Sequence, residues 1–167
     1  MADIAAARYA EALFELAKEK NLTDRTRDDA ALVISLLEES PELVRYLKMP
    51  DVAREKKEEM MTRITGSEVE RPMAGLLALV IRKDRISLLP DILTGYCELY
   101  RTYKNEAEAW VCSAKELTMD EIASIRSAIS HSVHKNIVIK TEVDPTVVGG
   151  LIVRVEGRVY DNSIRSS

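Results

Sequence analysis

The chain has 167 residues, enough for one ordinary domain or two small ones. Hydrophobic residues make up 46% of it and charged residues 31%, which is typical of a globular protein with a packed core. The formal net charge of −4, with no basic stripe, makes nucleic acid a poor electrostatic partner. The longest basic cluster, Arg54 to Glu59, is neutralised by its own acids at helical spacing, which indicates a solvated helix face.

Signals for export and for membrane insertion are weak. The start of the chain carries acidic side chains from Asp3 onward and lacks the layout of a signal or transit peptide. The longest uninterrupted apolar run, Met73 to Ile81, is far short of the roughly 18 residues that a membrane span needs. The two cysteines, Cys97 and Cys112, fit no metal-ligand or redox spacing and suggest a reducing compartment. We expect a cytosolic chain with no direct membrane insertion.

The N-terminal part of the chain shows helical periodicity almost throughout. Candidate N-caps occur at Thr23, at Ser40 and at Pro50-Asp51, and Gly66-Ser67 and Lys83-Asp84 interrupt the pattern. The short links favour a compact bundle of antiparallel neighbours. We expect five or six helices, placed at 3–20, 23–39, 41–48, 51–65, 69–83 and 86–104.

The first of these helices is apolar over about twice the arc that a surface helix needs to meet its core. Its apolar residues divide into two stripes, which are Ala6, Ala10, Leu13 and Ala17, and Ala5, Tyr9, Ala12 and Leu16. Either the bundle buries both stripes, or one stripe faces the bundle and the other binds an external helix, whose backbone the alanines would allow to come close.

The run from Pro72 to Ile81 raises the same question, because it is apolar all round and includes small residues. One of them, Gly75, costs about 1 kcal/mol relative to Ala in a helix interior, so a packing reason is expected for it. Two such helices in one small bundle could form a groove for a partner helix.

After Asn105 the pattern changes to that of a small α/β module. Residues 107–114 alternate with period two, as a strand does. Thr118 and Glu121 have capping-box spacing at the start of a helix whose apolar face holds Ile122, Ile125 and Ile129. Three more strand candidates follow, at 137–143, 151–156 and 158–161. The predicted fold is therefore α+β and mainly α, with a six-helix bundle at 1–104 and a C-terminal α/β module with a mixed sheet at 105–167.

The stretch "VDPTVVGGLIVRVEGRVYDNSIRS" (143–166) has the glycines of a phosphate-binding loop but not its context. Gly149-Gly150 precedes a strand and no helix opens after it. A structural interpretation accounts for the same residues: a turn at Asp144-Pro145, a bulge or close approach at Gly149-Gly150, a hairpin turn at Glu156-Gly157 and a turn at Asp161-Asn162.

The same stretch resembles the C-terminal signature of the delta subunit of bacterial F-type ATP synthases, the counterpart of the mitochondrial oligomycin-sensitivity-conferring protein. Residues 6–17 and 85–100 look like the first and sixth helices of that family, so the resemblance covers nearly the whole chain. Two departures are Asn162, where the family usually has Gly, and the end at Ser167, where relatives usually continue with a terminal helix. The signature residues present are Asp144, Pro145, Gly149, Gly150, Arg154, Gly157, Asp161, Ser163 and Arg165.

The resemblance implies a non-catalytic stator subunit in the peripheral stalk of a proton-translocating ATP synthase, one copy per complex, on the cytoplasmic face of the bacterial cell membrane. Its N-terminal bundle would bind the N-terminal helices of alpha subunits, and its C-terminal module would bind the C-terminal region of the b subunit. By position in the family, the alpha-subunit helix would contact Tyr9, Ala12, Leu13 and Leu16 of the first helix and Ala74, Leu76, Leu79 and Val80 of the fifth.

No catalytic, cofactor or metal site is expected. His131 and His134 have helical spacing but no third ligand, and surface histidines near a helix C-terminus are the simpler interpretation. No nucleophile motif is present. Two other functions stay open on the sequence, an independent helical adaptor and a small enzyme built on the α/β module. Trp110 is expected to cover the small sheet.

Overall fold

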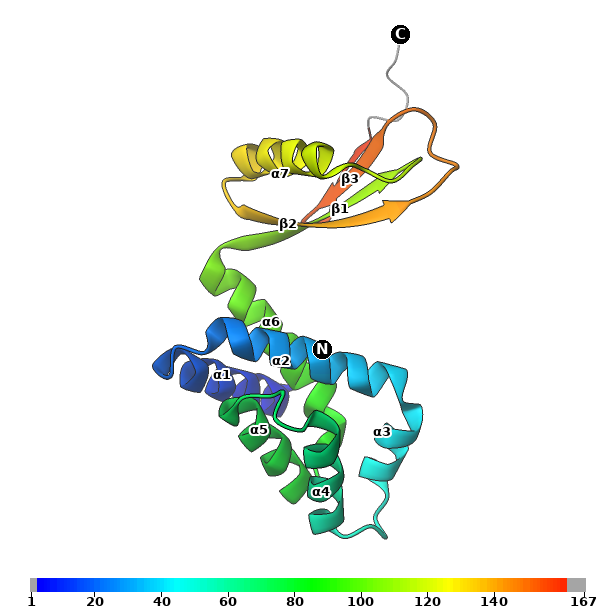
Figure 1. Cartoon of the computed structure of the whole chain (residues 1–167). Helices are drawn as coiled ribbons and strands as arrows, with labels where there is room; N and C mark the ends of the chain where they lie inside the picture. The colour runs from blue at the N-terminus through cyan, green and yellow to red at the C-terminus, as the bar shows by residue number, and fades with distance from the viewer. Residues whose placement is uncertain (1–2, 162–167) are drawn as a thin grey trace. The chain divides into compact units, whose positions relative to one another are not determined.

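The structure is a computed structural model that describes residues 3–161 and divides the chain into two compact units, Met1–Tyr100 and Arg101–Ser167. Helices alone make up the first unit. The second unit holds the end of the last of these helices, a four-stranded sheet and one further helix (Figure 1). The predicted fold class, α+β and mainly α with a mixed sheet, is confirmed.

The helices of the N-terminal unit follow the predicted order closely. Within residues 3–161 they are α1 (Ile4–Glu19), α2 (Thr23–Glu39), α3 (Pro41–Lys48), α4 (Arg54–Thr65), α5 (Arg71–Arg82), the 3-10 turn η1 (Ile86–Leu88) and α6 (Leu89–Lys104). The predicted start of the fourth helix at residue 51 was wrong. Residues 50–52 form a turn and a bend, and α4 begins only at Arg54.

Local chemistry sets the ends of α1 and α5. The Asp3 carboxylate caps α1 by accepting a hydrogen bond from the Ala5 N–H at 2.7 Å. The last turn of α1 closes with a left-handed residue, Asn21, followed by a hydrogen bond from the Leu22 N–H to the Ala17 carbonyl at 2.8 Å. The same motif ends α5, where Asp84 has φ 53°. Both helices therefore end at defined positions. At the end of α5, the left-handed backbone conformation of Asp84 fixes the position from which its side chain projects.

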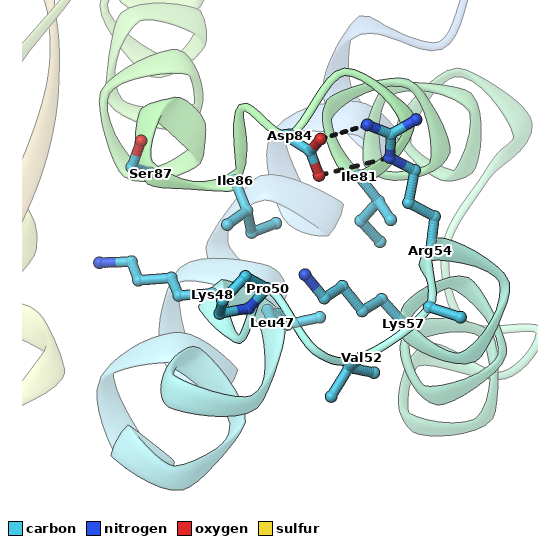
Figure 2. A pocket seen from close by; sticks show the side chains of 11 residues that line it. Leu47, Lys48, Pro50, Val52, Arg54, Lys57, Ile81, Asp84, Ile86 and Ser87 are labelled. Carbon is cyan, nitrogen blue, oxygen red and sulfur yellow. Dashed lines mark hydrogen bonds and ion pairs between the residues drawn. The ribbon is translucent and has the colours of Figure 1, made fainter.

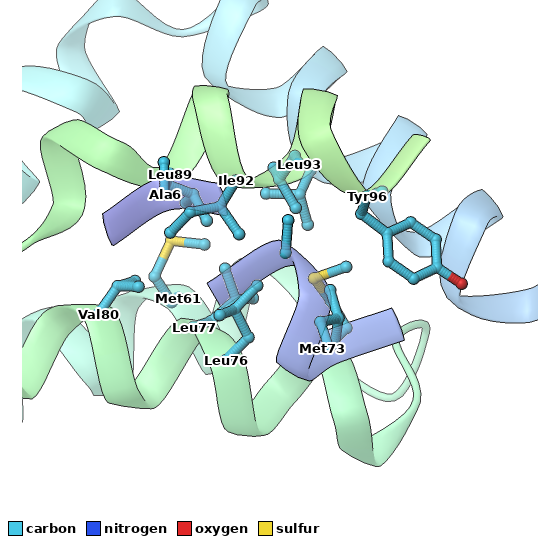
Figure 3. Close-up of a cluster of buried hydrophobic side chains, with 14 of the residues drawn as sticks. Ala6, Met61, Met73, Leu76, Leu77, Val80, Leu89, Ile92, Leu93 and Tyr96 are labelled. Atoms are coloured by element: carbon cyan, nitrogen blue, oxygen red, sulfur yellow. The ribbon is translucent and has the colours of Figure 1, made fainter. Parts of the chain in front are cut away.

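The core of this unit lies between α1, α5 and α6, with contributions from α2, α3 and α4 (Figure 3). Its largest fully buried side chain is Tyr96 of α6, whose ring centroid lies 5.9 Å from that of Phe14. The Tyr96 hydroxyl donates a hydrogen bond to the Thr23 carbonyl at 2.7 Å, which satisfies its polar atom and fixes α6 against the start of α2. Burial raises the pKa of this hydroxyl.

The C-terminal unit is built on a mixed sheet in the order β2-β1-β3-β4. Strand β1 pairs in parallel with β2 and antiparallel with β3, which in turn pairs antiparallel with β4. The parallel pair is joined by α7, whose N-cap Thr118 accepts a hydrogen bond from the Glu121 N–H at 3.2 Å, as the capping-box spacing predicted. The elements are β1 (Glu106–Ser113), α7 (Met119–Val133), β2 (Asn136–Val143), β3 (Leu151–Val155) and β4 (Arg158–Asp161).

Helix α7 covers one face of this sheet. Ala107 and Ala109 of β1 are buried in a cluster that includes Ile129 and Val133 of α7. The alternate residues of β1 point to the other face, where Trp110 is 47% exposed. The expectation that Trp110 covers the sheet was therefore wrong, because the alternation of β1 turns its small residues toward the helix and its tryptophan away from it.

Candidate partner-binding site

The two apolar stripes of α1 have different environments. Ala6, Ala10, Leu13 and Ala17 are all buried in the bundle core. In the second stripe, Ala5 and Tyr9 are half-buried, and Ala12 and Leu16 are exposed. Of the two alternatives that the sequence left open, burial of both stripes is excluded for the described chain. One helix thus presents an apolar strip to the bundle and a second apolar strip to the outside.

Helix α5 contacts α1 and also carries exposed apolar positions. Leu79 is 40% exposed, Ala74 and Gly75 are exposed, and Ala78 is half-buried. At the border between the two helices, Arg85 donates a hydrogen bond to the Tyr9 hydroxyl at 3.0 Å, and its guanidinium lies 5.8 Å from the centre of the Tyr9 ring. Tyr9, a half-buried member of the second stripe, is thereby held in place.

Three of the eight residues expected at the partner helix are core residues instead. Leu13 is 4% exposed, Leu76 is 6% exposed and Val80 is fully buried. Their side chains point into the bundle because each lies on the helix face that meets the neighbouring helices (Figure 3 labels Leu76 and Val80 there). These three assignments are corrected: the outward apolar surface, which we call the α1/α5 face, consists of Tyr9, Ala12, Leu16, Ala74, Gly75 and Leu79.

Gly75 was not among the predicted site residues, and its environment differs from the expectation. A Cβ atom added there would meet no atom within 4 Å, so the described chain offers no packing reason for a glycine. Its exposed position beside Leu79 leaves the backbone of α5 open to close approach from outside. The sequence marked Gly75 as unusual because glycine is unfavourable within a helix. The expectation that packing inside the protein explains this glycine was wrong.

The C-terminal signature forms turns around the sheet. Asp144 accepts hydrogen bonds from the N–H and the hydroxyl of Thr146, at 2.9 and 2.7 Å, and these bonds lower the pKa of its carboxyl group. Glu156 and Gly157 both have positive φ, 48° and 80°, as the hairpin between β3 and β4 requires. Arg154 pairs in register with Trp110. Asp161 is the last residue of the final strand, and Ser163, Arg165 and the second residue of the turn expected at 161–162 lie outside the described residues.

Comparison with known proteins identifies the family of this chain over nearly its whole length. The family model described as ATP synthase delta (OSCP) subunit matches residues 5–167. The chain belongs to the ATP synthase delta (OSCP) subunit family. Among its relatives, the ATP synthase subunit delta of Trichodesmium erythraeum is 34% identical over 158 residues, which cover 94% of this chain and 87% of that protein. The subunit delta of Bacillus thuringiensis is 33% identical over 97% of this chain and 90% of that protein.

A more distant likeness supports the fold. A chain of the mitochondrial ATP synthase hexamer of Toxoplasma gondii is 17% identical and superposes with a TM-score of 0.70, covering 93% of this chain and 87% of that one. Membership of the delta (OSCP) family makes this chain a structural, non-catalytic subunit of the peripheral stalk of an ATP synthase.

Two glycines of the family signature border an apolar pocket in the C-terminal unit. The pocket has a volume of about 640 Å³ and lies between the start of α7 and the loop before β3. Leu117, Ile125 and Leu151 supply apolar walls, and Gly149 and Gly150 form its rim. The expectation of a bulge or close approach at these glycines was wrong for Gly149: a Cβ there would meet nothing within 4 Å, and its φ of 59° is what favours glycine.

Neither histidine belongs to a metal-binding group within the part of the chain that the structure describes. His131 and His134 are both exposed, with ring centroids 6.5 Å apart. Within residues 3–161 no three His, Cys, Asp or Glu side chains lie close enough to hold a metal ion. None of the helices in this part of the chain combines the length and the apolar character needed to cross a membrane.

Proposed function

We propose that the α1/α5 face binds the N-terminal helix of an alpha subunit of the catalytic head. The observation that supports it best is the exposed apolar strip on α1, next to a helix whose Gly75 and Leu79 are also exposed. Small side chains at Ala12, Ala74 and Gly75 would let a helix backbone approach closely, and Leu16 and Leu79 would supply apolar contact.

This arrangement suits a mechanical role. A stator must hold the head still while the rotor turns, so its contacts have to resist force and need no catalytic group. Burial of apolar surface is non-directional and contributes about 25 cal/mol for each Å² removed from water. A partner helix lying along two helices would therefore be held over its whole length rather than at a single polar contact.

We propose that the C-terminal unit holds the C-terminal region of the b subunit at the pocket bordered by Gly149 and Gly150. The apolar walls of this pocket are accessible, and Met119 at the start of α7 is 87% exposed. An amphipathic helix end from the stalk would cover these side chains. With one copy per complex, on the cytoplasmic face of the bacterial cell membrane, the chain would link head and stalk through two separate interfaces.

The proposed interface with the alpha subunit is tested by calorimetric titration of the full-length protein with a peptide of the alpha-subunit N-terminus. We expect one-to-one binding that Ala12→Asp and Leu79→Asp abolish, since either carboxylate would be buried without a partner. Ala7→Asp is the matched control, because Ala7 is exposed on α1 but lies outside the apolar strip. Absence of binding by the intact, natively folded protein would refute the proposal that the α1/α5 face binds the alpha-subunit helix.

The proposed interface with the b subunit is tested separately, with a peptide that carries the C-terminal region of that protein. Leu117→Asp places a charge on the pocket wall and should abolish binding, whereas Ala128→Asp, at an exposed position of α7 that does not line the pocket, should leave it unchanged. Equal binding by both variants would move the b-subunit interface away from this pocket.

A further inference from the structure

Lys57 of α4 lies in an unexpected environment for a lysine. The sequence placed it on a solvated helix face, but the residue is only 6% exposed. Its side chain runs into a pocket of about 520 Å³ between α4, the end of α3, the turn at 50–52 and the segment that follows α5 (Figure 2). Leu47, Val52, Ile81 and Ile86 form apolar walls around the lysine.

The ammonium group of Lys57 has no protein partner among the described residues. Neither a hydrogen bond nor an ion pair within 4.0 Å is formed by its Nζ atom there. The one carboxylate that lines the pocket, Asp84, is paired with the guanidinium of Arg54. That pairing lowers the pKa of Asp84, with a smaller contribution from the charge of Lys57. The stem of Lys57 is buried while its ammonium group opens into the pocket without a partner in the described part of the chain, so an anion bound in the pocket could pair with it directly.

A second source of positive potential faces the same pocket. Helix α4 begins at the pocket, and its N-cap, Ala53, has no side chain that can accept a hydrogen bond from the first turn. The unsatisfied N–H groups and the helix dipole favour an anion at this end. Lys57 lies one turn further along the helix. The pocket also has Lys48 and Arg54 on its rim, so its lining side chains carry three positive charges and one negative charge.

We propose that this pocket binds a small organic anion, namely a carboxylate with a short apolar chain. The carboxylate lies between the Lys57 ammonium and the N-terminal N–H groups of α4, and the chain lies against Leu47, Val52 and Ile86. The apolar walls distinguish such a ligand from an inorganic anion, which would gain nothing from them. This site is separate from the α1/α5 face, because none of its lining residues belongs to that face, and it does not depend on the stator assignment.

The test is thermal unfolding of the full-length protein with hexanoate, with hexanol and with inorganic phosphate, at equal ionic strength. Hexanoate should raise the Tm in proportion to the logarithm of its concentration, because it binds only the folded state. Hexanol carries the same chain without the charge and should have no such effect. Amide NMR shifts induced by hexanoate should cluster in residues 47–57 and 81–87.

Lys57→Met removes the charge and keeps the apolar stem, and Lys56→Met is the matched control on the exposed side of α4. Lys57→Met should have a higher Tm without ligand and no response to hexanoate, and Lys56→Met should respond as the wild type does. The proposal is overturned if Lys57→Met responds to hexanoate like the wild type, if hexanoate leaves the wild type unchanged, or if phosphate acts as strongly as hexanoate. Binding of the alpha-subunit peptide to Lys57→Met should be normal, which separates this test from that of the stator function.

Discussion

The carboxylate of Asp29, in the middle of α2, accepts a hydrogen bond from the backbone N–H of Glu70 at 2.8 Å, at the start of α5. Asp29 is 2% exposed, and its other oxygen lies 3.5 Å from Nε of Arg25. Because Glu70 is the N-cap of α5 and provides no side-chain cap, Asp29 supplies an acceptor from a different helix. The start of a helix that forms part of the α1/α5 face is thus fixed by α2.

Substitution of Asp29 separates its acceptor role from its charge. Burial is the main cause that raises the pKa of Asp29, so the folded state disfavours the ionised form. Asp29→Ala should cost about 1–3 kcal/mol by leaving the Glu70 N–H unsatisfied. Asp29→Asn keeps an acceptor and avoids the charge, so it should cost less.

The pH dependence of these variants follows from the same shift. A raised folded-state pKa makes ionised Asp29 unfavourable above its unfolded-state value of about 3.9, and this penalty disappears as the pH falls below that value. The stability of Asp29→Asn relative to wild type should therefore be higher at pH 7 than at pH 4. Urea unfolding at the two pH values measures it, and an unchanged difference would show that the charge carries no penalty.

Two glycines in neighbouring helices should respond oppositely to alanine. At Gly75 a Cβ enters open space, so Gly75→Ala should stabilise the protein by about 0.5–1 kcal/mol through helix propensity. At Gly95 of α6 a Cβ would lie 3.1 Å from the Cβ of Ala10, so Gly95→Ala should gain less or destabilise by pushing α1 and α6 apart. Thermal unfolding of the two variants gives the comparison. Equal stabilisation would mean that α1 can shift away from the added methyl group at position 95 without loss of stability.

Substitutions at two adjacent residues of α5 should affect different properties, folding stability at Val80 and partner binding at Leu79. Val80 is fully buried, and Val80→Ala should cost about 2 kcal/mol through lost burial and a cavity. Leu79 is 40% exposed, and Leu79→Ala should cost less than about 1 kcal/mol but weaken binding of the alpha-subunit peptide. Denaturant unfolding and calorimetry on both variants test this, and the reverse ranking in either measurement would contradict the burial of α5.

The hairpin between β3 and β4 depends on two left-handed residues. Gly157 has φ 80°, so Gly157→Ala should destabilise the C-terminal unit by about 1–2 kcal/mol. Glu156 has φ 48°, and Glu156→Asn should stabilise the turn, because the exposed ion pair of Glu156 with Lys135 contributes little. Unfolding followed by the fluorescence of Trp110 measures both effects, and a loss of stability in Glu156→Asn would show that the ion pair outweighs the turn.

The sequence predicted the fold well because its signals were periodic and local. The stripe of Ala6, Ala10, Leu13 and Ala17 has the spacing of a core face, and Thr118 has that of an N-cap. Assignments that depend on a single helical position were less predictable. From the resemblance we expected Leu79 and Val80 in one interface, yet only Leu79 is exposed.

Lys57 shows a different limit. Charge composition suggested a solvated face, although Lys57 shares the spacing of the buried residues Met61 and Thr65 on α4. That spacing could have predicted the burial of Lys57. We overlooked it because a lysine carries a charged group, although its apolar stem can be buried. The prediction that the fourth helix starts at residue 51 was wrong because Pro and Asp favour both turns and helix starts, and Pro50 and Asp51 here form a turn.

The central claim is that the α1/α5 face anchors the head of the ATP synthase against rotation. The most direct measurement is to assemble the complex with the wild-type chain or with Leu79→Asp, and to follow ATP hydrolysis and ATP-driven proton pumping in parallel. We predict that Leu79→Asp leaves hydrolysis in place and abolishes pumping, because the head is no longer held. Full pumping by a complex that contains folded Leu79→Asp would contradict the account.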